Sequence, residues 1–349
     1  MGEEGKMDFS TTALNVLLLV AMALPGFFLI KTKMLPEKAI TYLSVLLLYV
    51  SQPFLSIRSF LEVSYTPQLA TNLAIMFAVS MAAQGLIFFG VWLVLHKRFD
   101  DPAVSRELIA EGFIDGNTIT REPELNALIA RSRSGRANRA VVLASAFGNV
   151  GFFGVPVLQV LFPGAHEAIA YSAVFIVSLN LMGWTVGSYV LTGDRKHISL
   201  KRALINPQTV TLVISLPLFF AGVSSSNLPD TINTIIGYLA DMTAPLCMII
   251  LGMRFALAPI TKLFTDFRVY VASVIKIVVF PLLVYLVLLP FRMDEMLRIS
   301  LVLLSGMPAA TIVLNLAEMY GSDRTTAANC ILMSTLLSII TIPVILLLF

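Results

Sequence analysis

The chain alternates between long apolar runs and short polar connections along nearly its whole length. Most runs are continuous and about 20 residues long, which is typical of membrane-spanning α-helices and not of the alternating strands of membrane barrels. We therefore predict an all-α polytopic membrane protein with ten transmembrane helices. Their expected ranges are 10–30, 37–60, 68–96, 139–162, 166–191, 207–223, 230–253, 268–290, 296–320 and 323–349.

The two halves of the chain resemble each other. Residues 24–53, "LPGFFLIKTKMLPEKAITYLSVLLLYVSQP", align with residues 216–245, "LPLFFAGVSSSNLPDTINTIIGYLADMTAP", and residues 164–178 resemble residues 321–335. Because each half would contain an odd number of helices, the halves would insert in opposite orientations, and we predict two inverted five-helix repeats. The matched prolines are Pro25 with Pro217, Pro36 with Pro229, and Pro53 with Pro245.

Lysine and arginine residues are distributed unevenly between the two sides of this arrangement. With the N-terminus outside, most of them fall in cytoplasmic loops. The positive-inside rule therefore predicts a multi-pass protein of the inner or plasma membrane with both termini outside. The first ten residues are acidic and no cleavage site follows the first apolar run, so we expect that run to be a retained span. The basic residues expected on the outer side are Lys6, Arg58, Arg292 and Arg298.

One long polar segment, residues 98–138, separates the third and fourth predicted spans. We interpret it as a cytoplasmic linker with one or two surface helices, and a regulatory or partner-binding role stays open. Its arginines Arg131, Arg133 and Arg136 are interpreted as topology determinants beside anionic lipid, and no nucleic-acid partner is expected. The expected divisions are 1–97 with helices 1–3, 98–138 with the insertion, 139–200 with helices 4 and 5, and 201–349 with the second repeat.

Composition agrees with a membrane protein and argues against an enzyme. Hydrophobic residues make up 57% of the chain and charged residues only 13%, whereas soluble domains carry roughly a quarter charged residues. The sequence contains no HExxH motif and no phosphate-binding P-loop, so no metal, cofactor or ATP-driven step is expected. Cys247 and Cys330 both lie in apolar stretches and predict no disulfide framework.

The fourth predicted span is interrupted by "FGNVGFFGVPVLQVLFPG", residues 147–164. Proline removes one backbone hydrogen bond of a helix, and the glycines lower helix propensity further. Backbone freed in this way survives at membrane depth only inside protein or around a polar cavity. We predict a break here, with a new half-helix starting at Pro156 and the polar residue Asn149 directly before the break.

The ninth predicted span carries a similar break. Ser305 and Gly306 precede Pro308 in "LLSGMPAATIVLNLAEMYG", and we expect the second half-helix to start at Pro308. Two such breaks in matching spans of an inverted repeat indicate a binding site at the midplane. Because helix N-termini present free N–H groups and a partial positive charge, the site is expected to favour an anion. Ordinary proline kinks and glycine packing are the structural alternative.

Three ionisable residues lie in or near the predicted spans. Asp241, Lys276 and Glu318 are candidates for ion coupling or charge compensation, since charges in lipid are costly. Asp241 and Lys276 could form a buried pair, and Asp241 is the candidate for proton coupling. Lys276 could instead supply positive potential to an anion site. Glu318, near a helix end, is expected at the membrane interface.

At this point the sequence resembles a known family. The pattern Asn-x4-Gly-x-Pro in "NVGFFGVP" is similar to the fourth helix of plant PIN-type auxin efflux carriers, and "MPAATIVLNLAEMYGSDRTTAANCILMSTLLSIITIPV" resembles the closing segment of the auxin efflux carrier family, including its bacterial members. The resemblance implies the fold of bile acid symporters and sodium/proton antiporters, with broken helices 4 and 9 crossing. It also implies a scaffold of helices 1, 2, 6 and 7, a mobile transport domain of helices 3–5 and 8–10, and a homodimer.

The resemblance implies specific site residues, and the chain departs from the plant pattern at two places. Asn149 matches the asparagine that contacts the substrate carboxylate, and Pro156 and Pro308 mark the crossover. The long insertion lies between helices 3 and 4 rather than 5 and 6, and Ala309 stands where the plant carriers have glutamine. The expected substrate-binding residues are Asn149, Gly154, Pro156, Pro308, Ala309 and Thr311.

These features favour a secondary transporter for small organic anions that works by elevator-type alternating access. Auxin-like or malate- and malonate-like carboxylates are the candidate substrates, and a proton or sodium ion is a candidate coupling partner. Two alternatives stay open: a cation/proton antiporter on the same fold, and a membrane sensor that signals through residues 98–138.

Overall fold

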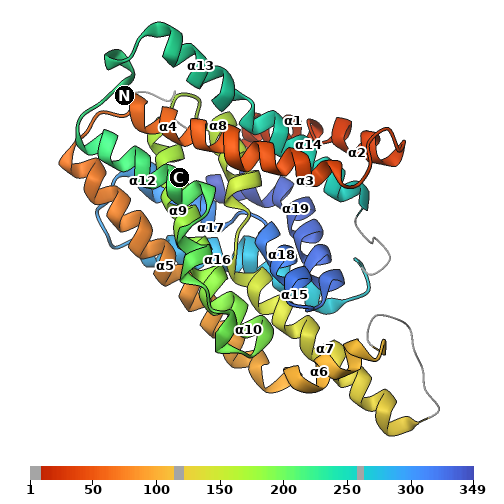
Figure 1. Cartoon of the computed structure of the whole chain (residues 1–349). Helices are drawn as coiled ribbons and strands as arrows, with labels where there is room; N and C mark the ends of the chain where they lie inside the picture. The colour runs from red at the N-terminus through yellow and green to blue at the C-terminus, as the bar shows by residue number, and fades with distance from the viewer. Residues whose placement is uncertain (1–8, 114–121, 258–262) are drawn as a thin grey trace.

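The computed structural model describes residues 9–113, 122–257 and 263–349. Within these ranges the chain is helical and forms no β-strand, apart from one isolated bridge between Gly148 and Ala309 (Figure 1). The α-helices are α1 (Phe9–Ala21), α2 (Leu24–Lys31), α3 (Ala39–Leu46), α4 (Gln52–Glu62), α5 (Pro67–Leu95), α6 (Pro102–Ala110), α7 (Pro123–Ala146), α8 (Val155–Leu161), α9 (His166–Met182), α10 (Ser188–Thr192), α11 (Leu200–Leu204), α12 (Pro207–Phe220), α13 (Asp230–Asp241), α14 (Thr243–Leu257), α15 (Phe267–Val274), α16 (Phe280–Leu288), α17 (Glu295–Ser305), α18 (Thr311–Met319) and α19 (Arg324–Leu346).

Seven helical runs in the described part of the chain are long and apolar enough to cross a membrane, and a bent pair adds an eighth. The bent pair joins 195–204 to α12 at an angle of 43°. The protein is therefore a polytopic helical membrane protein, as predicted. The predicted spans 139–162 and 296–320 are absent from these runs because each is divided into two helices by a break, so the count of ten stays a prediction.

Three helices contain a π-helical turn that is followed, after one intervening residue, by a proline. The turns are η2 (Leu47–Ser51), η4 (Val150–Gly154) and η9 (Ile275–Val279), and the prolines Pro53, Pro156 and Pro281 follow two residues after them. Proline cannot donate to the preceding turn and clashes with its carbonyl, so the helix widens there instead of ending.

Helices α2 and α14 touch through their backbones. A Cβ atom on Gly26 would lie 2.0 Å from the carbonyl oxygen of Ile249, and one on Gly252 would lie 1.8 Å from that of Ala23. Only glycine permits this approach, which is the small-residue packing typical of membrane helices. α2 and α14 therefore form one closely packed unit.

The structure of α6 and α7 differs from the prediction for the polar insertion, residues 98–138. The fourth span was expected to begin at residue 139, but α7 begins at Pro123 and continues unbroken to Ala146 (Figure 1). Arg139 forms an ion pair with Asp100 at 2.7 Å, with both side chains less than a tenth exposed. Charge neutralisation and hydrogen bonding allow these groups to be buried.

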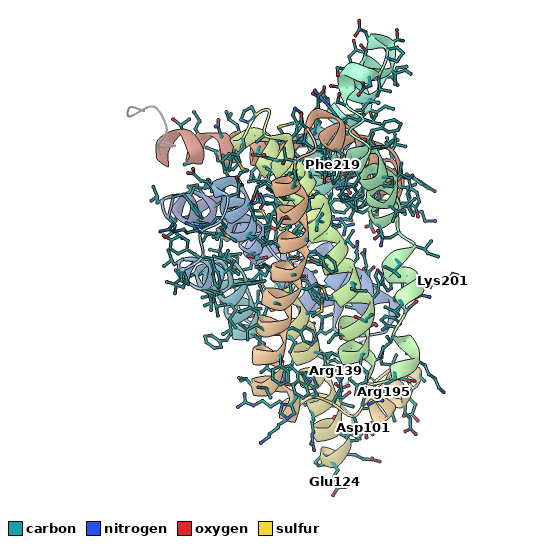
Figure 2. All side chains as sticks on the ribbon, turned by 90° about the vertical axis from the view of Figure 1, so that its left-hand side faces the viewer. Asp101, Glu124, Arg139, Arg195, Lys201 and Phe219 are labelled. Carbon is teal, nitrogen blue, oxygen red and sulfur yellow. The ribbon has the colours of Figure 1, made fainter. Side chains whose placement is uncertain are left out.

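The arginine expected beside lipid at position 136 is instead enclosed by protein. Arg136 is 8% exposed and its guanidinium donates hydrogen bonds to the carbonyl oxygens of Gly321 and Ser322, which connect α18 to α19. The later part of the insertion therefore belongs to α7, and it binds the loop between α18 and α19 through hydrogen bonds. Figure 2 shows Asp101, Glu124 and Arg195 gathered at this end of the molecule, far from Phe219.

Candidate functional site

The first break separates α7 from the helix formed by η4 and α8. Phe147 is extended, with φ −93° and ψ 121°, and Asn149 caps the helix that follows. That helix runs continuously from Val150 to Leu161. The predicted start at Pro156 is therefore wrong by six positions, because the π turn absorbs the proline within the helix.

The second break separates α17 from α18. α17 ends at Ser305, and α18 begins at Thr311 rather than at the predicted Pro308. Ala310, at the N-cap position, has an extended backbone and no side-chain group that could accept a hydrogen bond from the first turn. The first N–H groups of α18 therefore lack a side-chain cap.

The two breaks pair with each other through their backbones. The N–H of Asn149 donates to the carbonyl oxygen of Pro308 at 2.6 Å, and the N–H of Ala310 donates to that of Phe147 at 2.8 Å. Gly148 and Ala309 form an antiparallel bridge between these bonds. Backbone groups that cannot be left open in lipid thus satisfy each other inside the protein.

Asn149 is the polar side chain at this crossing. It is 2% exposed, and its Nδ2 atom is buried without a hydrogen-bond partner. Buried polar atoms are nearly always satisfied, so an amide donor left free at a break is a candidate for ligand binding. The carbonyl oxygen of Asn149 is used structurally, since it accepts from the N–H groups of Phe153 and Gly154.

Two side chains that sequence reasoning missed hold the π turn next to Asn149. The Nε2 of Gln52 donates to the carbonyl oxygen of Gly151 at 2.7 Å, and the thiol of Cys247 lies 3.6 Å from the same oxygen. The position of Gln52 directly before Pro53 offered a weak signal, because matched prolines already marked that helix as part of the repeat.

Lys276 lies against the crossing from the side of η9. It is 1% exposed, its Nζ donates to the carbonyl oxygen of Ser305, and it lies 4.5 Å from the centre of the Phe280 ring. A Cβ atom on Gly148 would lie only 3.1 Å from the Nζ. None of the ion pairs between described residues involves Lys276, so no carboxylate pairs with this side chain at the crossing.

Asp241 does not join this centre. It pairs with Arg58 at 2.7 Å, and its side chain is 66% exposed. The alternative of a buried pair between Asp241 and Lys276 is therefore wrong. The helix end at Asp241 faces outward, where a charge pair needs no burial.

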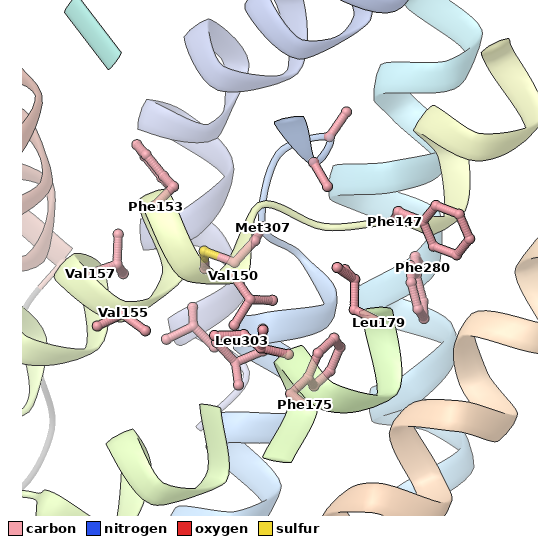
Figure 3. Close-up of a cluster of buried hydrophobic side chains, with 14 of the residues drawn as sticks. Phe147, Val150, Phe153, Val155, Val157, Phe175, Leu179, Phe280, Leu303 and Met307 are labelled. Atoms are coloured by element: carbon pink, nitrogen blue, oxygen red, sulfur yellow. The ribbon is translucent and has the colours of Figure 1, made fainter. Parts of the chain in front are cut away.

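Small and apolar residues fill the space around the crossing. A Cβ atom on Gly154 would lie 3.1 Å from side-chain atoms of both Leu304 and Met307, so Gly154 serves close packing here. Pro156 is likewise buried, in α8. Figure 3 shows the apolar side chains that enclose the two breaks, among them Phe147, Val150, Phe153, Phe280, Leu303 and Met307.

A cavity of about 620 Å³ begins at the second break. Thr311, the first residue of α18, lines it, and Glu318 lies on the same wall. The exposed residues Glu37 and Arg324 lie at its edge. The structure thus brings Asn149, Pro308, Ala309 and Lys276 together at the crossing, and places Thr311 and Glu318 on the adjoining cavity. Within the described ranges, no group of three or more His, Cys, Asp or Glu side chains is placed to hold a metal ion.

Comparisons with known proteins identify a family of transporters. Residues 192–346 match the profile of the family described as "Membrane transport protein". An uncharacterized transporter of Methanocaldococcus jannaschii is 30% identical over 210 residues, which is 58% of this chain and 65% of the relative. A Rhizobium meliloti protein, named as a proposed malonate transporter, is 30% identical over 206 residues, 57% of this chain and 63% of the relative.

A third relative, an uncharacterized transporter of Methanothermobacter thermautotrophicus, is 29% identical over 209 residues. The alignments span less than two thirds of the length of these curated relatives, between 63% and 65%. The matches confirm the resemblance to a family of membrane transporters and agree with the auxin efflux carrier family.

Proposed function

Taking this membrane transporter as a relative of the auxin efflux carriers, we propose that it is a secondary carrier for small organic anions. The observation that carries the proposal is the free Nδ2 donor of Asn149 at the point where two broken helices pair. The buried charge of Lys276 adds positive potential, and the uncapped N-terminus of α18 adds N–H donors. Buried N–H donors without a protein acceptor, with a positive charge nearby, favour a carboxylate.

The proposed arrangement has ten spans, in which the two broken helices count as the fourth and ninth. The matched prolines of the two halves support inverted repeats. Close backbone packing of α2 on α14 supports a rigid scaffold, against which a transport domain of helices 3–5 and 8–10 would move as an elevator. The scaffold of helices 1, 2, 6 and 7 would also form the homodimer.

The cavity supports a state that is open to the cytoplasm. Its rim residues Glu37 and Arg324 lie on the side to which the positive-inside rule assigns most basic residues. Cysteine labelling tests this orientation in the plasma or inner membrane. An impermeant maleimide added to intact cells should label Ser226→Cys, on the proposed outer side, and should leave Glu124→Cys unlabelled until the membrane is opened.

Transport itself is tested with purified protein in liposomes. Radiolabelled malonate should be taken up and should exchange with unlabelled malonate inside, and an imposed membrane potential should change the rate. Export of one negative charge from a negative interior releases about 2.3 kcal/mol per 100 mV, so uniport efflux needs no further energy. Proton or sodium coupling would appear as a dependence of flux on that ion's gradient.

The same experiment separates the alternatives. Ion-driven pH change without malonate flux would establish a cation/proton antiporter instead. Malonate binding without any flux, together with capture of a partner by residues 98–138, would establish a sensor. The exposed pairing of Asp241 with Arg58 weakens the antiporter hypothesis, because that hypothesis gives Asp241 and Lys276 central roles and Asp241 lies away from Lys276.

A further inference from the structure

The cavity beside the second break is lined by one face of α18 and one face of α14, and residues of α19 and of the segment 37–41 complete its wall. On α18 the lining residues are spaced three and four apart, from Thr311 through Asn315 to Glu318, so they form a single stripe. On α14, Leu251 lies three positions before Arg254 and four before Phe255, so these lining residues also share one face. The cavity thus joins the uncapped start of α18 to the last turn of α14.

Arg254 is the cationic group on the α14 wall, and among the described residues no carboxylate lies within ion-pair distance of its guanidinium, although the more distant Glu318 acts on it electrostatically. Its Nε is buried without a hydrogen-bond acceptor. The guanidinium carbon lies 5.7 Å from the centre of the Phe152 ring, in the π turn that follows Asn149. Glu318 lines the same cavity but does not come within the 4 Å of an ion pair.

A buried guanidinium nitrogen without an acceptor, on the wall of a cavity, is a candidate ligand-binding feature. Arginine offers five donors in a planar fork that matches the two oxygens of a carboxylate. A surface arginine would hydrate freely, but the buried Nε of Arg254 has lost its water without gaining a protein acceptor, which is costly unless a ligand supplies one. The cation–π contact with Phe152 places the guanidinium beside the π turn that follows the first break.

We propose that Arg254 binds a second anionic group of the transported molecule, while the first anionic group lies at the paired breaks. This subsite rests on the proposed anion transport and extends it to a selection between anions. A molecule with two carboxylates satisfies both the crossing and Arg254, whereas a monocarboxylate leaves Arg254 without an acceptor. Arg254 lies on α14 and Thr311 on α18, so a bound dianion bridges two separate helical units.

Binding measurements with matched ligands test the subsite. The probes are malonate and succinate, each paired with its monomethyl ester, which keeps the length and removes one charge. In the unaltered protein at least one diacid should bind about 10- to 150-fold more tightly than its ester, the range expected for a hydrogen-bonded charge. Arg254→Gln should remove that advantage by weakening the diacid alone, and Arg254→Lys should restore part of it.

Arg324→Gln is the matched control, because Arg324 lines the same cavity from an exposed position. It removes an equal charge and should change the diacid-to-ester ratio less than about threefold. Monodispersity and thermal unfolding show whether each variant is folded. If Arg254→Gln does not fold, Arg254→Lys is used in its place to test the subsite.

The outcomes separate the subsite from the proposed function. If the unaltered protein binds esters as tightly as diacids, or if Arg254→Gln weakens both alike, the subsite is wrong while anion binding stands. If Arg324→Gln lowers the ratio as much as Arg254→Gln does, the effect is general electrostatics and the subsite is again wrong. If no carboxylate binds, both the proposed function and the subsite are wrong.

Discussion

The two breaks pair with each other through their backbones, yet they differ in chemistry. The first contains Asn149, whose amide donor is free, and is followed by a π turn held by Gln52. The second contains Ala309 and Ala310, whose side chains cannot hydrogen-bond, and the N–H of Ala309 is satisfied by the hydroxyl of Ser334 at 2.9 Å. Both breaks have the same backbone role, but only the first offers a side-chain donor to a ligand.

The two breaks therefore share a backbone role without sharing a role in ligand recognition. Pairing of the two backbones requires small residues and free carbonyls on both sides, and both breaks provide them. Ligand recognition requires a polar group at one point, and the first break provides it. We therefore expect changes in the first break to alter binding, and changes around the second break to alter stability.

The largest effect is expected for Asn149→Ala. Loss of a hydrogen bond to a charged ligand costs about 1.5–3 kcal/mol, so malonate affinity should fall about 10- to 150-fold. The thermal midpoint should stay nearly unchanged, because Nδ2 has no partner in the protein to lose. Calorimetric titration and thermal unfolding measure the two quantities.

Asn149→Asp sharpens the same test. It keeps the shape of the side chain and places a negative charge where the anion would lie, so binding should fall further than in Asn149→Ala. Equal affinity in all three proteins would show that Asn149 does not touch the ligand.

The second effect is expected for Ser334→Ala, which acts on the second break. The variant leaves the buried N–H of Ala309 without an acceptor, and an unsatisfied buried donor costs about 1–3 kcal/mol. The thermal midpoint should therefore fall, while malonate affinity measured on the folded protein should change less than about threefold.

Ser338→Ala is the matched control on the same helix. Its buried hydroxyl bonds to the carbonyl oxygen of Thr335 and supports no N–H of either break. A loss of stability in Ser338→Ala equal to that in Ser334→Ala would mean that the bond to Ala309 has no special role.

The third-largest effect in free energy is expected for Lys276→Met, since Lys276 lies next to Gly148 in the first break and Ser305 at the second. A charge about 10 Å from the anion, in surroundings with an effective dielectric constant of about 20, contributes roughly 1.7 kcal/mol. Anion affinity should fall on the order of tenfold. Stability should not fall, because removal of a buried charge without a carboxylate partner offsets the lost bond to Ser305. A lower thermal midpoint with unchanged affinity would make Lys276 a structural residue only.

Much of the break architecture could be predicted from the sequence, since glycine and proline act locally on the helix. The positions of both breaks and the presence of Asn149 at one of them followed from the residues themselves. The starts of the half-helices did not, because a π turn can keep Pro156 inside a helix and the sequence gives no local sign of it.

Side-chain partners that lie far apart along the chain could not be predicted from the sequence. Nothing local shows that Arg139 pairs with Asp100, or that Asp241 pairs with Arg58 rather than with Lys276. Arg254 lies in the last turn of α14, and only its place on a cavity wall gives it a candidate role. Periodicity predicts which face of a helix is apolar, but the register between helices decides which polar groups meet.

The smallest effect is expected for Gln52→Leu, which changes the support of the first break and leaves Asn149 in place. The variant removes the hydrogen bond to the carbonyl oxygen of Gly151, worth about 0.5–1.5 kcal/mol, while the thiol of Cys247 still faces that oxygen. Because the π turn adjoins Asn149, its loosening should reduce malonate affinity about two- to fivefold together with a small fall in the thermal midpoint. Gln68→Leu, which loses only a bond to Asn72 on the same helix, should leave affinity unchanged. A decrease in affinity as large as that of Asn149→Ala would mean that Gln52 itself contacts the anion, and the first break would then offer two donors rather than one.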